Sequence, residues 1–427
     1  MWGQTRWPKK LGALLAGGLL VFNTAAVFAD PIELSLDDSV TMALKNNPSI
    51  KMALADKDKA NWAINEAKAG KGVSIDFTHS DSRLHSEAAG TYNSFSNTAS
   101  LSLPLYTGGK LEGQIDQAKL SAKVSDLALS QTMQEVKLNA TTGYYDILEA
   151  RNMLTVDRES VESLTGHLKN VQAQYDVGTV AKSDLLRSEV ELANAQQTLF
   201  KAQNTYDLAV TAFKNVLELP FDSQIILKED LKYEKYDLTL ADAVQHGLEH
   251  RPEMVQAQLN VDIAKESVKI AKSGKLPTVA LSASNGWNDT TYPGADNNNW
   301  SVGVSAKFNV FDSGLTKSQV KEANASVDKA VATGQQTRDT VISDVQSAYL
   351  SLREAEKRIG TSKVTVEKAT EDFKIAQVRY SAGVGTNIDV LDAQVSLTEA
   401  KTNYVQALYD YNSSRAKLDK AMGIAVQ

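Results

Sequence analysis

Hydrophobic and polar residues follow two different periods along this chain. In four short stretches they alternate one by one, as in Trp300-Ser-Val-Gly-Val304, which is typical of strands with one apolar and one polar face. In much longer stretches apolar residues recur every three or four positions, which predicts helices. The predicted strands cover 73–82, 97–106, 278–287 and 299–311.

The same order of elements occurs twice, at an offset of about 205 residues. The pairs related in this way include Tyr175 and Tyr380, Gly178 and Gly383, and Asp184 and Asp389. A nearly constant offset across each half indicates a duplicated unit. We therefore expect two repeats, 30–230 and 231–427, each with helix, β-hairpin and long helix in that order. Two units are too few for a solenoid, so the repeats should pack side by side.

Each repeat contains one helical stretch of unusual length. From Gly109 to Gly178, and again from Gly314 to Gly383, 69 positions separate the two glycines, so each helix could span about 100 Å. The helices that return from Gly178 and Gly383 carry a seven-residue repeat with a seam of small residues, which favours coiled-coil packing. Long helical hairpins are expected at 110–219 and 315–422.

The first 29 residues differ from the rest. Three basic residues precede an apolar run from Leu11 to Phe28 that ends in Val27-Phe-Ala29, the pattern of a secretory signal peptide. An uncleaved membrane anchor is the alternative, weakened by glycines and polar residues within the run. Cleavage would change the net charge from −7 to −10, which argues against a nucleic-acid partner.

Candidate catalytic and metal sites are few. The chain has no cysteine, which excludes thiol catalysis and cysteine metal sites, and no set of Ser, His and Asp has a recognisable spacing. His246 and His250 lie four positions apart on a predicted helix, but no third ligand is close in sequence. We expect no enzyme activity, no cofactor and no metal site.

The four strands raise the question of how their edges are covered. Four strands cannot close into a barrel, and an open edge in a bilayer leaves backbone groups unpaired. Because membrane barrels begin at about eight strands, several chains would have to share one barrel. The apolar strand faces suit outer-membrane lipid and the polar faces suit a wet lumen. A soluble sheet packed on a helical body remains the alternative.

The duplicated order, the matched lengths and the Tyr-x-x-Gly-x-x-x-x-x-Asp tips resemble the TolC-type outer-membrane efflux proteins, also called outer membrane factors, over about 31–424. The resemblance implies a mostly α-helical homotrimer, whose helical barrel in the periplasm continues into a shared 12-stranded membrane β-barrel. It also implies two partners, a periplasmic adaptor (membrane fusion protein) and an inner-membrane transporter of the RND, ABC or MFS type.

The resemblance assigns roles to residues near the tips. Asp389 and Asp392 correspond to acidic rings at the pore constriction, although helix capping by Asp389 is an alternative. Asp184 and Tyr380 correspond to the contact between the two hairpins of the closed entrance. The family has an arginine where this chain has Gly385, so the closing contact must differ.

The turns between the long and the returning helices would dock the adaptor. These tip residues are Val177, Gly178, Thr179, Val180, Ala382, Gly383, Val384 and Gly385. Glycine also serves turn geometry alone, because it adopts positive φ freely.

The sequence thus predicts an outer-membrane exit duct of a tripartite efflux or type I secretion system, opened at its periplasmic tip. One alternative is a periplasmic or surface coiled-coil structural protein without a pore. A nutrient-uptake porin fits less well, because porins have more strands per chain and no such helices. The sequence identifies neither the cargo nor the class of transporter.

Overall fold

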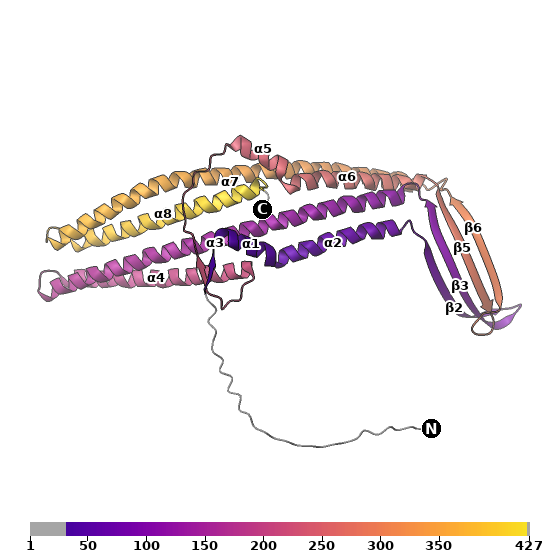
Figure 1. Ribbon diagram of the computed structural model, residues 1–427, viewed down its shortest axis with the longest axis horizontal. Helices are drawn as coiled ribbons and strands as arrows, with labels where there is room; N and C mark the ends of the chain where they lie inside the picture. The colour runs from indigo at the N-terminus through magenta and orange to yellow at the C-terminus, as the bar shows by residue number, and fades with distance from the viewer. Residues whose placement is uncertain (1–30, 425–427) are drawn as a thin grey trace, which may run out of the picture.

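The computed structural model describes residues 31–424, so the predicted signal peptide lies outside the described part of the chain. Two repeats of the same design form one elongated molecule with the sheet at one end and two helical tips at the other (Figure 1). The first repeat comprises α1 (Leu36–Asn46), α2 (Pro48–Ala69), β2 (Ser74–Ser86), β3 (Gly90–Tyr106), α3 (Lys110–Asp176) and α4 (Lys182–Leu217). The second comprises α5 (Leu240–His250), α6 (Pro252–Lys272), β5 (Thr278–Asp289), β6 (Asn297–Lys307), α7 (Leu315–Ser381) and α8 (Asn387–Ala421).

The two long helices, α3 and α7, have 67 residues each and are therefore about 100 Å long. Each begins after a glycine at φ 85°, Gly109 or Gly314, where the chain turns out of the sheet. Helix α2 covers the sheet-proximal part of α3 and α4 covers the tip-proximal part, while α6 and α8 divide α7 in the same way (Figure 1). Contacts of α3 with α6 and α8 join the repeats.

The sheet contains four antiparallel strands in the order β2-β3-β5-β6. Each hairpin therefore pairs through its inner strand, and β2 and β6 remain as edges. Strands β2 and β3 pair continuously from Ser74 with Ser102 to Ser86 with Gly90. The predicted strands ended at residue 82 and resumed at residue 97, and these bounds were wrong. From His79 to His85 the face that begins with Ile75 and Phe77 is polar, so the alternation of apolar and polar residues disappears although the backbone pairing continues.

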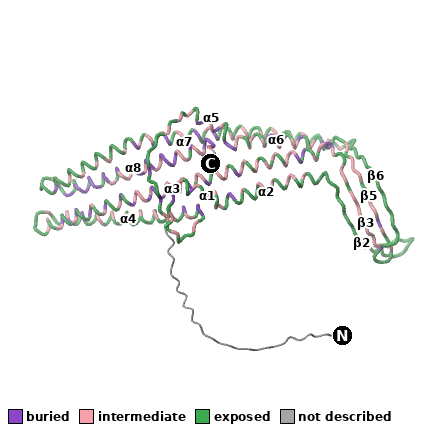
Figure 2. The backbone as a smooth tube through the Cα atoms, viewed as in Figure 1, coloured by how far each residue is buried: buried purple, intermediate pink, exposed green. Residues whose placement is uncertain are grey.

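The register separates the sheet into two faces. One face is apolar for most of its length and exposes large side chains, including Ile75, Phe77, Trp300, Val302 and Val304. The opposite face carries serine, threonine, glycine and asparagine at most positions. Asp76 and Lys307 are its charged residues within the four strands. Most of the sheet surface is exposed in the single chain (Figure 2).

A large apolar core lies about midway between the sheet and the tips. Here two short parallel strands, β1 (Ile32–Leu34) and β4 (Ile225–Leu227), lie beside the long helices. The segment that follows β4 crosses between the repeats: Tyr411 Oη of α8 donates to the Glu234 carbonyl oxygen (2.6 Å). The core includes Tyr144, Phe213, Leu352, Tyr411 and Leu418. The sequence analysis did not predict this second sheet, whose strands have three residues each.

Among the helices of residues 31–424, none has both the length and the apolarity needed to cross a membrane.

Candidate gate at the helical tips

The two tips end their long helices in the same way. Gly178 (φ 77°) and Gly383 (φ 73°) adopt the left-handed conformation. Thr179 N donates to the Gln174 carbonyl oxygen (2.9 Å), and Val384 N donates to that of Arg379 (3.0 Å). Each of these hydrogen bonds closes a turn of six residues and is typical of a Schellman motif, which needs a residue that adopts positive φ freely. The turns leave Val177 and Val384 exposed at 75% and 68%.

Asp389 has a local structural role at the start of α8. Its backbone N–H donates to Thr386 Oγ1 (3.2 Å), and its Oδ2 accepts from Thr386 N (2.9 Å), so the two residues form a capping box. The backbone N–H and the hydroxyl of Thr386 hold the pKa of Asp389 below its usual value. Asp392 is exposed one turn further along. The carboxylates lie three residues apart on one helix and so share a face.

Asp184 and Tyr380 are close together at the tip but are not joined by a hydrogen bond. Tyr380 is 8% exposed, and its hydroxyl has no hydrogen-bond partner among the described residues. Burial and, secondarily, the negative charge of Asp184 raise the pKa of Tyr380. The hydrogen bonds between the hairpins at the tip are made by other residues.

A small apolar cluster, here called the tip cluster, joins all four helices near the turns and is separate from the large core. Each helix contributes one buried residue: Val171 from α3, Leu185 from α4, Tyr380 from α7 and Val390 from α8. Its members bury their side chains between the two hairpins, so separating the hairpins would expose them to water.

A buried polar bridge lies beside the tip cluster and connects α3, α4 and α8. Asn387 Nδ2 donates to the Asp184 carbonyl oxygen (3.0 Å) and to Ser188 Oγ (3.2 Å). Its Oδ1 accepts from His167 Nε2 (2.6 Å). The three side chains of Asn387, His167 and Ser188 are 4%, 7% and 1% exposed. The His167 ring also lies 5.2 Å from that of Tyr380, centroid to centroid.

The backbone around Gly385 leaves little space for a side chain. A Cβ atom at this position would lie 3.0 Å from Tyr380 N and 3.1 Å from the Arg379 carbonyl carbon. Both are backbone atoms that cannot move aside as a flexible side chain can. Gly385 N also donates to the Arg379 carbonyl oxygen (3.0 Å), which keeps the turn tight against the end of α7.

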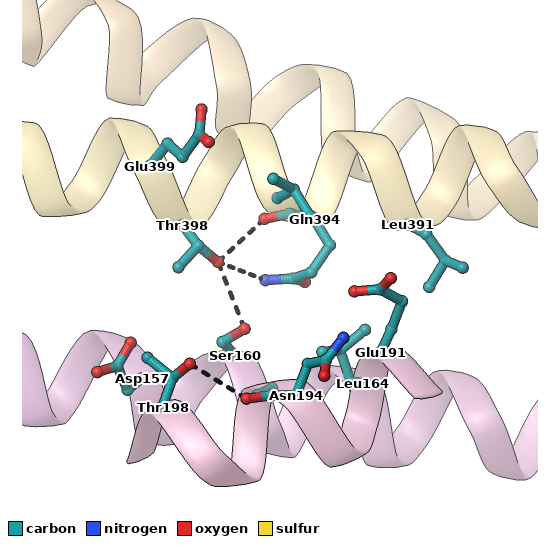
Figure 3. A pocket seen from close by; sticks show the side chains of 12 residues that line it. Asp157, Ser160, Leu164, Glu191, Asn194, Thr198, Leu391, Gln394, Thr398 and Glu399 are labelled. Atoms are coloured by element: carbon teal, nitrogen blue, oxygen red, sulfur yellow. Dashed lines mark hydrogen bonds between the residues drawn. The ribbon is translucent and has the colours of Figure 1, made fainter. Parts of the chain in front are cut away.

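Further from the tip, the hairpins are separated by a hollow of about 190 Å³ (Figure 3). Helix α3 lies between α4 and α8 and contributes Ser160, while Gln394 and Thr398 come from α8. Thr398 Oγ1 donates to Ser160 Oγ (3.4 Å), and Ser163 Oγ donates to Gln394 Oε1 (2.7 Å). A larger hollow of about 760 Å³ shares several of these residues. The hairpins are therefore less closely packed here than at the tip cluster.

The comparison with known proteins fits this architecture. Residues 40–217 and 243–424 match the family described as Outer membrane efflux protein, one match in each repeat. The chain belongs to this family. It is an outer-membrane protein related to efflux channels.

Curated relatives align over nearly the whole chain. Outer membrane protein TolC of Escherichia coli is 27% identical over 401 residues, which cover 88% of this chain and 80% of TolC. Alkaline protease secretion protein AprF of Pseudomonas aeruginosa is 22% identical over 434 residues, covering 97% and 89%. A crystal structure of a membrane protein from Pseudomonas aeruginosa has the same fold, with a TM-score of 0.81 and 20% identity over 91% of this chain and 93% of that one.

His246 and His250 of this efflux protein stack at 4.0 Å between ring centroids. Their Nδ1 atoms lie 2.9 Å and 3.1 Å from the carbonyl oxygens of Met422 and His246. Within residues 31–424, no three His, Asp or Glu side chains are grouped so that they could hold a metal ion. The pair is accounted for by these backbone contacts.

The sequence analysis missed His167, Ser188 and Asn387 as site residues. One signal was available: Ser160, Leu164, His167 and Val171 are spaced by four, three and four along α3, so His167 occupies a heptad seam position. A polar residue in such a seam usually has a specific partner on a facing helix. That partner, Asn387, is 220 positions away, and periodicity alone could not identify it.

Proposed function

We propose that three copies of this efflux protein form a passive exit duct, with a closed barrel of twelve strands and a tunnel of twelve helical segments in the periplasm. The observation that carries the proposal is the four-stranded sheet with unpaired edges β2 and β6. Pairing β6 of one chain with β2 of the next would remove every edge, as a membrane requires. The trimer and the strand number also follow the family resemblance.

The two faces of the sheet support this arrangement. Trp300, Val302 and Val304 are 76%, 64% and 64% exposed in the single chain, and in a barrel this apolar face would contact lipid. The serine-rich face would line an aqueous lumen. A soluble sheet would instead cover its apolar face with the helices, but here the sheet extends beyond them (Figure 1).

The helices also have surfaces that a second copy would cover. Helix α4 exposes Val190, Phe200 and Leu208 at 58%, 72% and 61%, and α7 exposes Leu350 at 62% and Val364 at 54%. These helices lie at opposite sides of the helical layer, since α3 and α8 lie between them. Contact between α7 of one chain and α4 of the next would bury apolar surface and close the tunnel.

The tips would form the periplasmic entrance. Asp389 and Asp392 from three chains would place six carboxylates around a narrow opening, which would attract cations. Asp184 and Tyr380 would lie between the hairpins that separate when the entrance opens. The exposed turns at Val177–Val180 and Ala382–Gly385 would dock a periplasmic adaptor. An inner-membrane transporter would supply the energy, because the duct has no catalytic role.

The cargo depends on the transporter. One relative bears the name of alkaline protease secretion and another that of a toluene efflux pump, so related ducts serve both proteins and small molecules. The serine-rich lumen face carries no feature that selects between them.

Purified protein in planar bilayers tests the proposal. We expect native mass spectrometry to show an assembly of three chains. We also expect the inserted protein to give discrete single-channel conductance. A protein that remains monomeric and never conducts would overturn the duct and favour a coiled-coil structural protein.

A further inference from the structure

The polar bridge at Asn387 gives the two hairpins their hydrogen bonds closest to the tips. Asn387 belongs to the second hairpin, whereas His167, Ser188 and the Asp184 carbonyl belong to the first. Ser188 Oγ also donates to the Asp184 carbonyl oxygen (2.9 Å), so the bridge is a connected network rather than isolated bonds.

The polar groups of this network are hydrogen-bonded to one another and are almost completely shielded from water. Both amide atoms of Asn387 have partners while the residue is 4% exposed. When a buried hydrogen bond breaks and water cannot replace it, the donor and the acceptor are left unpaired, and each then costs its full desolvation free energy. A small relative displacement of the hairpins, before water can enter, would therefore be opposed more strongly here than at an apolar contact.

We propose that Asn387, held by His167 and Ser188, is the positioning residue that keeps the two hairpins together in the closed entrance, and that protonation of His167 releases it. This rests on the proposed function, because it assumes that the hairpins separate on opening. It supplies a closing contact in a chain that has glycine, with no side chain, at position 385.

The surroundings of His167 make it sensitive to acid. Burial lowers the pKa of His167 from its usual value, and the hydrogen bond with Asn387 offsets this only in part. The ring of His167 faces Tyr380 from α7 and Asn387 from α8. Ser188 and the Asp184 carbonyl oxygen, both from α4, are bonded to Asn387 rather than to His167. The side-chain carboxylate of Asp184 raises the pKa of Tyr380, but it is not among the causes of the lowered pKa of His167.

The direction of the pH effect follows from this environment. When the hairpins separate, His167 becomes hydrated and its pKa returns toward about 6.5. The open state then binds more protons than the closed state below that pH. The closed contact is thus at full strength above about pH 6.5 and weakens as the pH falls below it.

Thiol labelling measures the separation directly, because the chain has no native cysteine. Val171, 0% exposed in the tip cluster next to the bridge, is replaced in Val171→Cys. Its modification rate by a soluble maleimide is compared at pH 7.5 and pH 5.5, after correction for the reactivity of a small thiol. We expect acid to raise the corrected rate by up to about tenfold. Val136→Cys, 4% exposed in the large core on the same helix, is the control and should not respond.

Variants of the bridge distinguish a specific role from general packing. Asn387→Leu in the Val171→Cys background should raise the rate about tenfold at pH 7.5. Ser188→Ala, which removes one partner with little change in volume, should give a smaller increase. His167→Gln keeps an N–H donor but does not titrate, so its rate should be the same at both pH values. An acid response that persists in His167→Gln, or unchanged rates in Asn387→Leu and Ser188→Ala, would overturn the proposal.

Conductance recordings on the same proteins separate this proposal from the duct itself. If the parent protein conducts but Asn387→Leu neither raises the conductance nor changes the labelling rate, the bridge is not the closing contact, while the proposal of an exit duct is still supported. If labelling responds as expected but no protein conducts, the hairpins separate as described and the duct assignment fails.

Discussion

Gly383 has a conformation that other residues adopt only at a cost. Its φ of 73° closes the Schellman motif at the end of α7, and a Cβ there would meet no atom within 4 Å, so the cost of a side chain is purely conformational. We expect Gly383→Ala to destabilise the tip by about 1 kcal/mol. Hydrogen exchange of the tip amides measures this. Gly360→Ala, in the middle of α7 with equally open surroundings, should instead slow exchange locally, because alanine favours a helix.

Asp389 combines a cap with a charge at the proposed entrance. Hydrogen bonds from the Thr386 backbone N–H and hydroxyl lower the pKa of Asp389 below its usual value of 3.8. The carboxylate is therefore ionised at every pH above 3.8, and the cap weakens only when the pH falls through the lowered pKa. Between pH 5 and 8 the charge is therefore constant, and any gating change in that range must come from other groups.

Removing both tip carboxylates should weaken block of the channel by multivalent cations. In Asp389→Asn with Asp392→Asn, six negative charges would leave the entrance of the proposed trimer, and the blocking concentration should rise about tenfold or more. Asp339 is exposed on α7 and lies far from the tip, so Asp339→Asn serves as the control. Equal block in the double variant and in the parent would place the constriction elsewhere.

At the scale of elements, helix α8 depends on small residues along its buried side. Ala393, Ala400 and Ala407 are 5%, 3% and 0% exposed, and their spacing of seven is the seam that the sequence predicted. Close helix approach leaves no volume for a longer side chain. Ala407→Leu should therefore lower the free energy of unfolding by about 1–3 kcal/mol.

Thermal unfolding followed by circular dichroism measures the effect of Ala407→Leu. The matched change Ala325→Leu, at an exposed position on α7, should stay within about 0.5 kcal/mol of the parent. Equal effects of the two substitutions would mean that the seam is not closely packed.

The strands illustrate where element prediction succeeds and where it stops. Alternation located the hairpins because one face there is apolar. The prediction ended the first strand at residue 82, because the face that begins with Ile75 and Phe77 continues with the polar residues His79, Asp81 and Arg83. Backbone pairing needs no apolar side chain once a neighbouring strand is in register, so a hydrophobicity pattern cannot detect the end of such a strand.

At the scale of the whole molecule, charge is unevenly divided between the sheet and the helices. The polar face of the sheet carries one acidic and one basic residue per chain, Asp76 and Lys307. In the proposed trimer the lumen of the barrel would therefore be almost neutral, and the tips would determine ion preference.

Reversal potentials in a salt gradient test this division. The parent channel should prefer cations, and Asp389→Asn with Asp392→Asn should lose most of that preference. Asp76→Asn should retain it. The preference should also decline as the salt concentration rises, because screening shortens the range of the charges. A larger effect of Asp76→Asn than of the double variant would move the selective region into the barrel.

The sequence by itself determined the duplication, the long helices, the glycine turns and the apolar and polar strand faces, because each is encoded in the spacing of nearby residues. Only the tertiary structure decided the pairing of β3 with β5, the short parallel sheet and the bridge between His167 and Asn387. All three features join residues far apart in sequence, whereas the capping box of Asp389 is local and was an alternative that the sequence already offered. Local periodicity specifies which face of an element is buried, but not which partner that face meets.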